Sequence, residues 1–381
     1  MISSRALEIP PFIVMEVMER ALELEKKGER VIHLEIGEPD FDTPQCIKEA
    51  CFKALCDGAT HYTHSLGLLE LREAISADYE ETYGVRVSPD RIIVASGSST
   101  AMLLLFSALL EQGDEVILPN PYYPCYPNII KYVGGVPVFV DVLEEEGFQY
   151  LPEMISPKVG SRTEGILINS PSNPTGNLLS GERMEEIARL SPLIISDELY
   201  HGLVYEGEVH TILEYTENAV IVNGFSKLYA MTGWRLGYLI APKEFVRPMQ
   251  RLQQNLFISP NSFVQLAAIN ALREAESDVR RMRETYDQRR KFMIRRLREL
   301  GFGIMVEPTG AFYILANAKR FSEDSYRFAF DILEKAKVGV APGIDFGTNA
   351  EGFLRFSYAR SMEDIEEGMD RLEGYLRKWR R

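Results

Sequence analysis

The chain has 381 residues, 45% of them hydrophobic and 26% charged, which is the composition of a folded globular protein and excludes a disordered chain. Its length is sufficient for a large core and for two domains. The formal net charge of -14 excludes the basic face that binding of nucleic-acid phosphates requires.

Targeting, membrane and metal signals are missing from the sequence pattern. Residues 1–20 contain neither a long apolar core nor a small-residue cleavage site, so we expect no signal peptide and a cytoplasmic protein. The longest apolar run, "AMLLLF", is too short to span a bilayer. No C-x-x-C or H-E-x-x-H spacing occurs among the histidines and the four cysteines Cys46, Cys51, Cys56 and Cys125. We therefore expect buried free thiols and no metal.

The first part of the chain predicts helices and one short strand. Residues 10–28 carry apolar side chains at helical spacing and end in a glycine. Residues 31–44 predict a strand that runs into a turn rich in Gly, Pro and Asp. Residues 44–58 and 65–84 predict two further helices, each of which ends at a glycine.

From residue 91 the pattern changes to short apolar runs that are rich in Ile and Val. Continuous runs of this kind are typical of strands that are buried on both faces of a mostly parallel sheet. Helical or loop segments separate most of the runs, which indicates a doubly wound α/β domain. The runs occupy residues 91–97, 115–121, 136–142, 165–171, 192–198, 219–225 and 236–242.

The last third of the chain predicts a second, smaller α+β domain. Residues 260–300 predict one long helix with a solvated, charged face, and strand-like runs follow at 311–318, 338–343 and 353–359. The N-terminal helix is expected to pack with this smaller domain. We therefore predict three segments, which are an N-terminal arm and helix (1–45), a large domain (46–275) and a small C-terminal domain (276–381).

Polar side chains follow several of the predicted strands. Gly97, Ser98 and Ser99 form a small turn that opens an apolar helix, where free N–H groups and the helix dipole attract an anion. Asn173 lies in a rigid turn after one strand, and Asp197 ends the next strand. Because ligands collect at the carboxyl ends of parallel strands, we expect these groups to lie close together.

A lysine with a specific chemical use follows the strand 219–225. It is Lys227, which stands among small residues in "NGFSKLYAMTGWRLGY". A lysine amine forms a Schiff base with an aldehyde, and pyridoxal phosphate supplies that aldehyde together with a phosphate and a pyridine nitrogen that needs a carboxylate. The sequence offers Lys227 for the aldehyde, Asp197 for the nitrogen, and Ser98, Ser99 and Arg235 for the phosphate.

The segment "GFSKLYAMTGWRLG" resembles the lysine signature of the class I/II aminotransferases, the fold-type-I enzymes that depend on pyridoxal phosphate. Seven further segments resemble blocks of this family in the family's order, namely "GEPDFDTP", "HYTHSLGLLELREAI", "NPYYPCYP", "NSPSNPTG", "SDELYHGL", "PTGAFYIL" and "LRFSYA". The resemblance covers almost the whole chain. It implies a large, doubly wound, mostly parallel sheet domain and a smaller α+β domain.

The resemblance implies roles for individual residues at the reacting centre. Lys227 matches the Schiff-base lysine, which also shuttles the proton, and Asp197 matches the partner of the pyridine nitrogen. Tyr200 and Asn173 match the donors to the cofactor's phenolate oxygen. Tyr123 matches the aromatic residue that stacks on the ring.

Other residues match the phosphate, substrate and subunit contacts of the family. Ser98, Ser99 and Arg235 match the phosphate clamp, and Tyr122 is the alternative to Tyr123 for the stacking position. The substrate α-carboxylate is gripped in the family at the positions of Arg355, of Asn173 and of the backbone N–H of Gly37. Tyr62 matches the tyrosine that reaches the phosphate held by the partner subunit, which implies a homodimer.

Two departures from the family pattern bear on cofactor and substrate. Many members carry a serine three residues before the lysine, where this chain has Gly224, so one phosphate contact is lost and weaker cofactor binding is expected. Aspartate-preferring members often carry a lysine where this chain has Ser99, which puts aspartate specificity in doubt. Residues 10–15 and 255–262 are expected to be apolar pocket walls, and Arg5 is a candidate cation for a second carboxylate.

The expected reaction is a ping-pong transfer of an amino group from a neutral or aromatic L-amino acid to a 2-oxo acid. Three alternatives stay open on the sequence. They are a β-lyase (C–S lyase) that uses the same cofactor, an aspartate-preferring aminotransferase, and a non-catalytic binding protein that retains the fold.

Overall fold

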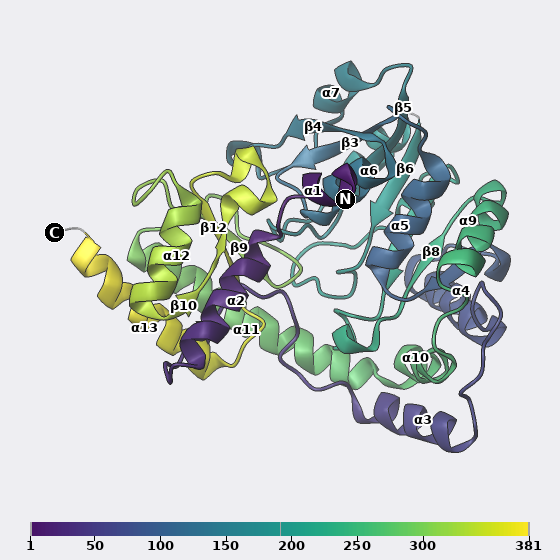
Figure 1. Cartoon of the computed structure of the whole chain (residues 1–381), viewed down its shortest axis with the longest axis horizontal. Helices are drawn as coiled ribbons and strands as arrows, with labels where there is room; N and C mark the ends of the chain where they lie inside the picture. The colour runs from purple at the N-terminus through teal and green to yellow at the C-terminus, as the bar shows by residue number, and fades with distance from the viewer. Residues whose placement is uncertain (1, 191, 380–381) are drawn as a thin grey trace.

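The computed structural model describes residues 2–190 and 192–379 of the chain. In Figure 1 the chain forms a larger body on the right and a smaller one on the left, and a long helix, α11 (Glu276–Leu300), runs between them. Of the helices in the described ranges, none has the length and apolar character that a bilayer crossing demands.

The larger body is built on a seven-stranded sheet with the order β2-β8-β7-β6-β5-β3-β4. Its strands are parallel to their neighbours except β8, which is antiparallel to both β2 and β7. Each apolar run predicted between residues 91 and 242 lies in this sheet, so the mostly parallel α/β fold is confirmed. The strands span Ile92–Ala95 (β2), Glu115–Asn120 (β3), Val136–Asp141 (β4), Thr163–Asn169 (β5), Leu193–Asp197 (β6), Ala219–Gly224 (β7) and Gly237–Ile240 (β8).

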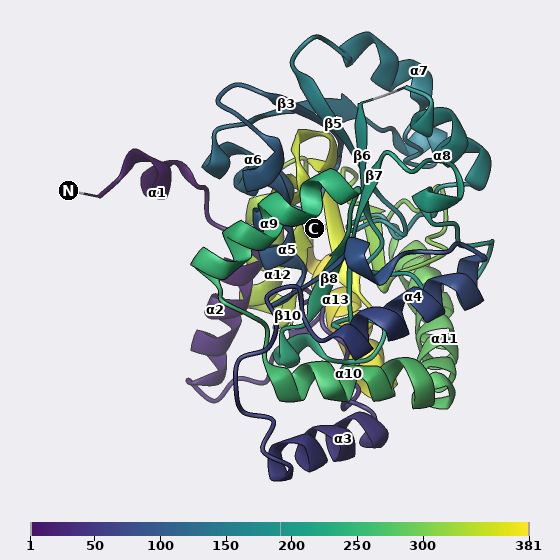
Figure 2. The ribbon, with the colours of Figure 1, turned by 90° about the vertical axis from the view of Figure 1, so that its right-hand side faces the viewer.

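Helices cover both faces of this sheet, which is why its strands are apolar on both sides. The apolar cluster on one face includes side chains of α3, α4, α8 and α10, and the cluster on the other includes side chains of α5, α6 and α9. In Figure 2, α5, α6 and α9 lie on one side of the sheet and α4 and α8 on the other. The helices span Gln45–Cys56 (α3), Leu69–Tyr83 (α4), Ser98–Leu109 (α5), Cys125–Val133 (α6), Gly181–Ala188 (α8), Lys243–Leu256 (α9) and Ser262–Glu274 (α10), with a short α7 at Pro152–Ile155.

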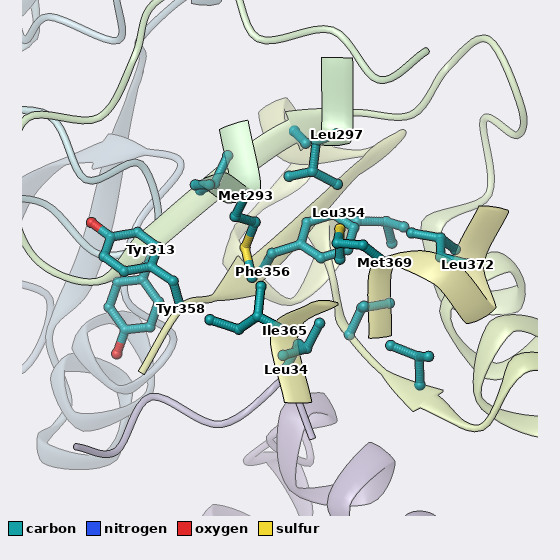
Figure 3. Packing of buried hydrophobic residues seen from close by; sticks show 14 of the residues in the cluster. Leu34, Met293, Leu297, Tyr313, Leu354, Phe356, Tyr358, Ile365, Met369 and Leu372 are labelled. Atoms are coloured by element: carbon teal, nitrogen blue, oxygen red, sulfur yellow. The ribbon is translucent and has the colours of Figure 1, made fainter. Parts of the chain in front are cut away.

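The smaller body combines both ends of the chain. A three-stranded antiparallel sheet, β11-β12-β9, and a parallel pair, β1-β10, pack with α2, α11, α12 and α13. Figure 3 shows part of the apolar cluster at its centre, where Leu34 from the start of the chain lies beside Phe356 and Ile365 from its end. Its elements span Ile13–Glu25 (α2), Ile32–His33 (β1), Tyr313–Asn317 (β9), Ser325–Ala336 (α12), Val338–Gly339 (β10), Ala341–Pro342 (β11), Phe353–Ser357 (β12) and Met362–Trp379 (α13).

The structure corrects one of the predicted elements. The single helix expected over residues 260–300 is two helices, α10 and α11, which meet at Ala275, where ψ is 7° instead of the helical value near -42°. The break allows α10 to pack against α3 of the larger body while α11 continues to the smaller one. The short strand expected at the start of residues 31–44 is confirmed as β1, whose two residues pair with the equally short β10. The predicted divisions at residues 45 and 275 stay a prediction.

The short helix α1 (Ser4–Glu8) precedes these elements. None of its residues is buried, and in Figure 2 it extends away from both bodies. It includes Arg5, the candidate cation for a second carboxylate, which does not line the cavity between the two bodies.

Candidate active site

A cavity of about 280 Å³ lies where the carboxyl ends of the large sheet's strands meet the smaller body. This is where the connectivity of such sheets places ligands. Its lining includes the predicted residues Gly37, Ser98, Ser99, Tyr123, Asn173, Asp197, Tyr200, Lys227, Arg235 and Arg355. Residues that are far apart in the sequence are thus brought together around one space.

The turn before α5 forms an anion site at one end of the cavity. Gly97 has a φ of 98°, which is unfavourable for a residue with a side chain, and α5 begins at Ser98 with unpaired N–H groups. The guanidinium of Arg235 lies against this turn, because a Cβ added at Gly97 would be 2.5 Å from its Nη2. Helix N–H groups and an arginine on one site are an arrangement that binds phosphate.

The carboxylate of Asp197 ends β6 and is almost completely buried. It accepts hydrogen bonds from the hydroxyl of Tyr126 at 2.5 Å and from the backbone N–H of Leu199 at 3.1 Å. Burial raises the pKa of Asp197 to about 6, and the two hydrogen bonds oppose that rise. No salt bridge joins Asp197 to any described cation, so a positively charged ligand group would be its counter-ion.

Lys227 follows β7, and its Nζ donates to the carbonyl oxygen of Gly37 at 2.7 Å. Burial lowers the pKa of Lys227 to about 8, and the nearby charges of Arg355 and Arg235 lower it further, while Glu38 and Asp197 oppose the change. A substantial fraction of this amine is therefore unprotonated near pH 8, which is the form that attacks an aldehyde.

Arg355 lies on β12 with its guanidinium buried and without a salt bridge to a carboxylate of the described chain. Its Nη1 donates to Oδ1 of Asn173 at 2.9 Å and its Nη2 to the carbonyl oxygen of Glu35 at 2.5 Å. The rings of Tyr313 and Phe346 lie 4.3 and 4.6 Å from the guanidinium carbon. Because buried charges are ordinarily paired, this arginine is a site for a ligand carboxylate or phosphate.

Three residues that the sequence analysis missed support the predicted ones. Tyr126 lies one helical turn beyond Tyr123, and this spacing from a stacking residue was the available signal for it. The hydroxyl groups of Tyr313 and Tyr200 form a hydrogen bond, with 2.8 Å between their oxygens. Asn169 accepts the backbone N–H of Asn173 at 2.8 Å, and it donates to the carbonyl oxygen of Asp197 at 3.1 Å.

The structure distinguishes between the two candidate stacking tyrosines. Tyr123 lines the cavity, whereas Tyr122 stacks on Phe139, with 5.0 Å between the ring centroids, and does not line it. Of the two expected apolar walls, residues 10–15 contribute Phe12, Val14 and Met15 to the lining. Residues 255–262 contribute none within one chain.

Tyr62 lies away from the cavity that its own chain forms. It is 85% exposed in the loop between α3 and α4, and no residue of that loop lines the cavity. Other exposed apolar side chains lie on the elements that flank this loop, namely Phe52 and Leu55 of α3 and Leu69 at the start of α4. Leu256 at the end of α9 and Ile258 after it are also exposed, and this segment contacts the loop through the hydrogen bond from the Thr63 N–H to the Ser259 hydroxyl. The contact of Tyr62 with a partner subunit stays a prediction.

The close approach of a neighbouring strand favours glycine at position 224. It pairs with Gly237 of β8, and a Cβ at Gly224 would lie 3.0 Å from both the Gly237 Cα and the Leu236 carbonyl oxygen. A serine side chain there would require these backbone atoms to shift by a few tenths of an ångström. Ser226, two residues on, lines the cavity and offers a hydroxyl group instead.

These residues fit pyridoxal phosphate. One cavity brings together three groups that this cofactor needs. They are an amine with a lowered pKa, a buried carboxylate without a salt bridge, and an anion site formed by helix N–H groups and an arginine. The doubly wound sheet and this constellation define a fold-type-I aminotransferase. The family model of the class I and II aminotransferases matches residues 29–372, and the chain belongs to this family.

Relatives of known name are similar over the whole length. A (5-formylfuran-3-yl)methyl phosphate transaminase of Methanocaldococcus jannaschii is 43% identical, with 99% of this chain and 100% of the relative covered. An aspartate aminotransferase of Pyrococcus horikoshii is 41% identical, with 98% and 97% covered. The crystal structure of Thermus thermophilus aspartate aminotransferase with maleate has a TM-score of 0.94 at 38% identity, with 98% and 99% covered. The protein is therefore a pyridoxal-phosphate-dependent aminotransferase.

Proposed function

We propose that this aminotransferase takes the amino group of a neutral or aromatic L-amino acid and transfers it to a 2-oxo acid in two half-reactions. When bound, pyridoxal phosphate supplies an aldehyde carbon that accepts the amino group and a protonated ring that withdraws electrons. The observation that carries the proposal is the composition of the cavity. It holds a carboxylate-binding arginine, and its wall near the substrate is apolar.

In this proposal the larger body holds the cofactor. The N–H groups of α5, Ser98, Ser99 and Arg235 bind the phosphate, and Tyr123 covers the ring. The carboxylate of Asp197 stabilises the proton on the ring nitrogen, because a buried anion lowers the free energy of a neighbouring cation. Tyr200 and Asn173 donate to the phenolate oxygen. Each is held by a further hydrogen bond, Tyr200 to the hydroxyl of Tyr313 and the backbone N–H of Asn173 to Asn169.

The amino acid lies between the two bodies. Arg355 binds its carboxylate through two parallel N–H groups, and the backbone of Gly37 lies beside it. The Nζ of Lys227 takes the proton from the α-carbon, for which a pKa of about 8 suits work near neutral pH. The hydrogen bond of this amine to the Gly37 carbonyl oxygen would have to break before Lys227 could hold the cofactor.

The substrate side chain is expected to meet an apolar wall. The cavity is lined by Phe12, which precedes α2, by Val14 and Met15 from the first turn of α2, and by Ile36. The cations in the lining are Lys227, Arg235 and Arg355, and each already has a role in the proposal. A second carboxylate would therefore lose its hydration without gaining a counter-ion, which costs several kcal/mol.

A second candidate concerns the acceptor. The name of the Methanocaldococcus jannaschii relative describes a formyl group on a furan ring with a methyl phosphate. Such an aldehyde has no α-carboxylate, so its phosphate would be the anion that Arg355 binds. The aromatic side chains of Phe12 and Tyr123, which meet edge to face with 6.1 Å between their centroids, suit a flat ring.

A panel of half-reactions tests these proposals. The spectral change of the bound cofactor is recorded with alanine, leucine, methionine, phenylalanine and aspartate as single donors, and then with 2-oxoglutarate and an aryl aldehyde phosphate as acceptors. We expect kcat/KM for a neutral or aromatic donor to exceed that for aspartate. A value for aspartate about tenfold above every neutral donor would refute the apolar preference. An S-alkyl cysteine is added as a donor for the lyase alternative, and release of a thiol, pyruvate and ammonia from it without any acceptor would instead indicate a β-lyase.

We further propose a homodimer in which Tyr62 completes the site of the partner. The exposure of Tyr62 and of the apolar residues around it supports this proposal. Lys227→Ala and Tyr62→Phe proteins are mixed and allowed to exchange subunits. If Tyr62 acts across the interface, each mixed dimer has one site with both changes and one with neither, so activity is recovered. Absence of recovery after verified exchange would place Tyr62 outside the partner's site.

A further inference from the structure

The apolar wall of the cavity is the first turn of a helix whose own sequence does not stabilise its start. The helix α2 begins at Ile13, and the residue before it, Phe12, has no side-chain group that caps the helix. The first N–H groups of a helix have no partner within the helix. In α2 these groups include the N–H groups of Ile13 and Val14, which lie between the lining residues Phe12 and Met15, and Val14 also lines the cavity.

The missing cap is supplied from the other end of the chain. The two oxygens of the Asp345 carboxylate accept the backbone N–H groups of Ile13 and Val14, each at 3.0 Å. Asp345 lies in the 3-10 turn Gly343–Phe346 and is 8% exposed. A carboxylate at a helix N-terminus is stabilised both by the hydrogen bonds and by the helix dipole. The first turn of α2 is therefore capped by this side chain.

The same turn also contacts the arginine of the site. Phe346, the next residue, stacks on the guanidinium of Arg355, and Val14 packs in the same apolar cluster as Phe346. Arg355 attracts the Asp345 carboxylate, whereas Glu16 in the first turn of α2 repels it. The other titratable groups that feel this carboxylate are Tyr122 and Cys125, whose pKa values it raises as a secondary cause.

We propose that Asp345 is a positioning residue that sets the substrate preference by fixing the first turn of α2 as the wall of the side-chain pocket. The inference deepens the proposed function and rests on it. With the cap in place, Phe12 and Met15 are held against the cavity and Val14 is held in the cluster beneath Arg355. Without the cap the turn frays, and large apolar side chains lose the surface that they contact. A small side chain such as that of alanine reaches less of this wall and is less affected.

The test compares Asp345→Asn with a matched control, Asp324→Asn, in the holoenzyme. Asp324 caps α12 by accepting the N–H of Arg327 at 2.9 Å, far from the cavity lining. Hydrogen exchange of the peptide that contains residues 12–18 and half-reaction kinetics with leucine, phenylalanine and alanine are measured for both variants. For Asp345→Asn we expect about tenfold faster exchange and about tenfold higher KM for leucine and phenylalanine, with kcat and the KM for alanine within about twofold of wild type.

A pH series adds a readout that a merely structural role would not move. Burial raises the pKa of Asp345 to about 6, so as the pH falls through this value the carboxylate gains a proton. The oxygen that carries the proton becomes a donor, and one of the two acceptors for the N–H groups of α2 is lost. The KM of wild type for leucine is therefore expected to rise below pH 6, and this rise is expected to vanish in Asp345→Asn.

The outcomes separate this inference from the proposed function. Unchanged exchange and unchanged KM ratios in Asp345→Asn would overturn the inference while transamination itself continues. An equal loss for alanine, leucine and phenylalanine would also overturn it, because the cap would then support the fold and not the side-chain pocket. If wild type transaminates no neutral donor, the proposed function fails. The exchange measurement still decides whether Asp345 holds the turn.

Discussion

Replacement of Asp197 by asparagine is expected to move stability and activity in opposite directions. Asparagine has the size and shape of the aspartate and no charge. Its Oδ1 accepts the N–H of Leu199 and its Nδ2 donates to the hydroxyl oxygen of Tyr126, so both contacts of the carboxylate have a replacement. The variant therefore isolates the effect of the charge.

The size of the stability effect follows from the pKa of Asp197. Burial raises it from 3.8 to about 6, and the folded apoprotein therefore binds a proton more tightly than the unfolded chain. Stability is thus lost as the pH rises between these two values, and at about 1.4 kcal/mol per pKa unit the loss above pH 6 is about 3 kcal/mol. For a chain of this length the same energy corresponds to a change in Tm of about 4 °C.

Thermal unfolding of the apoproteins between pH 4 and pH 8 measures this difference. We expect Asp197→Asn to melt about 4 °C above wild type at pH 8 and at the same temperature at pH 4. With cofactor, turnover is expected to fall about 10³-fold, or about 4 kcal/mol of transition-state stabilisation, because the ring nitrogen loses its anion. Equal melting temperatures at pH 8 would refute the reasoning, since they would mean that the carboxylate is not desolvated in the folded apoprotein.

Three further predictions concern other residues of the site. Lys227→Ala is expected to abolish multiple turnover and covalent trapping of the cofactor by borohydride, and trapping on another lysine would contradict the assignment. Tyr313→Phe removes the hydroxyl that lies 2.8 Å from that of Tyr200. The pKa of the bound cofactor, followed by its absorbance as the pH is changed, should therefore shift by about one unit at unchanged cofactor content. An unaltered titration would show that this contact has no effect on the cofactor. Gly224→Ser places a side chain against the backbone of Gly237 and is expected to lower the free energy of unfolding by about 1–3 kcal/mol. Tighter cofactor binding at unchanged stability would contradict this.

The groups at the strand ends were predictable from the sequence. Asn173, Asp197 and Lys227 each follow an apolar run, and the carboxyl ends of parallel strands lie at one edge of a sheet. A charged or amide residue after a buried strand is a local pattern, and the sheet topology then brings such residues together. No other information was needed to place these three around one cavity.

The supporting contacts were not predictable, because their two partners lie far apart in the sequence. Tyr313 meets Tyr200 across 113 residues, and Asp345 meets Ile13 across 332. Neither partner carries a local signal, since a tyrosine on a strand and an aspartate in a turn are common. The helix break at Ala275 also lacked a signal, because no Gly or Pro interrupts the pattern there and tertiary packing alone sets it.

The pairing of β1 with β10 has a consequence for how the chain is made. Ile32 pairs with Val338, so a strand formed at the start of synthesis has no partner until nearly the whole chain has emerged. At about 5–20 residues per second this delay is about 15–60 s on the ribosome, during which the seven-stranded sheet is completed first. Throughout this time the apolar face of α2, with Val14, Val17 and Leu24, has nothing to cover it. The nascent chain is therefore expected to expose a chaperone-binding helix at its N-terminus until residues beyond 338 arrive.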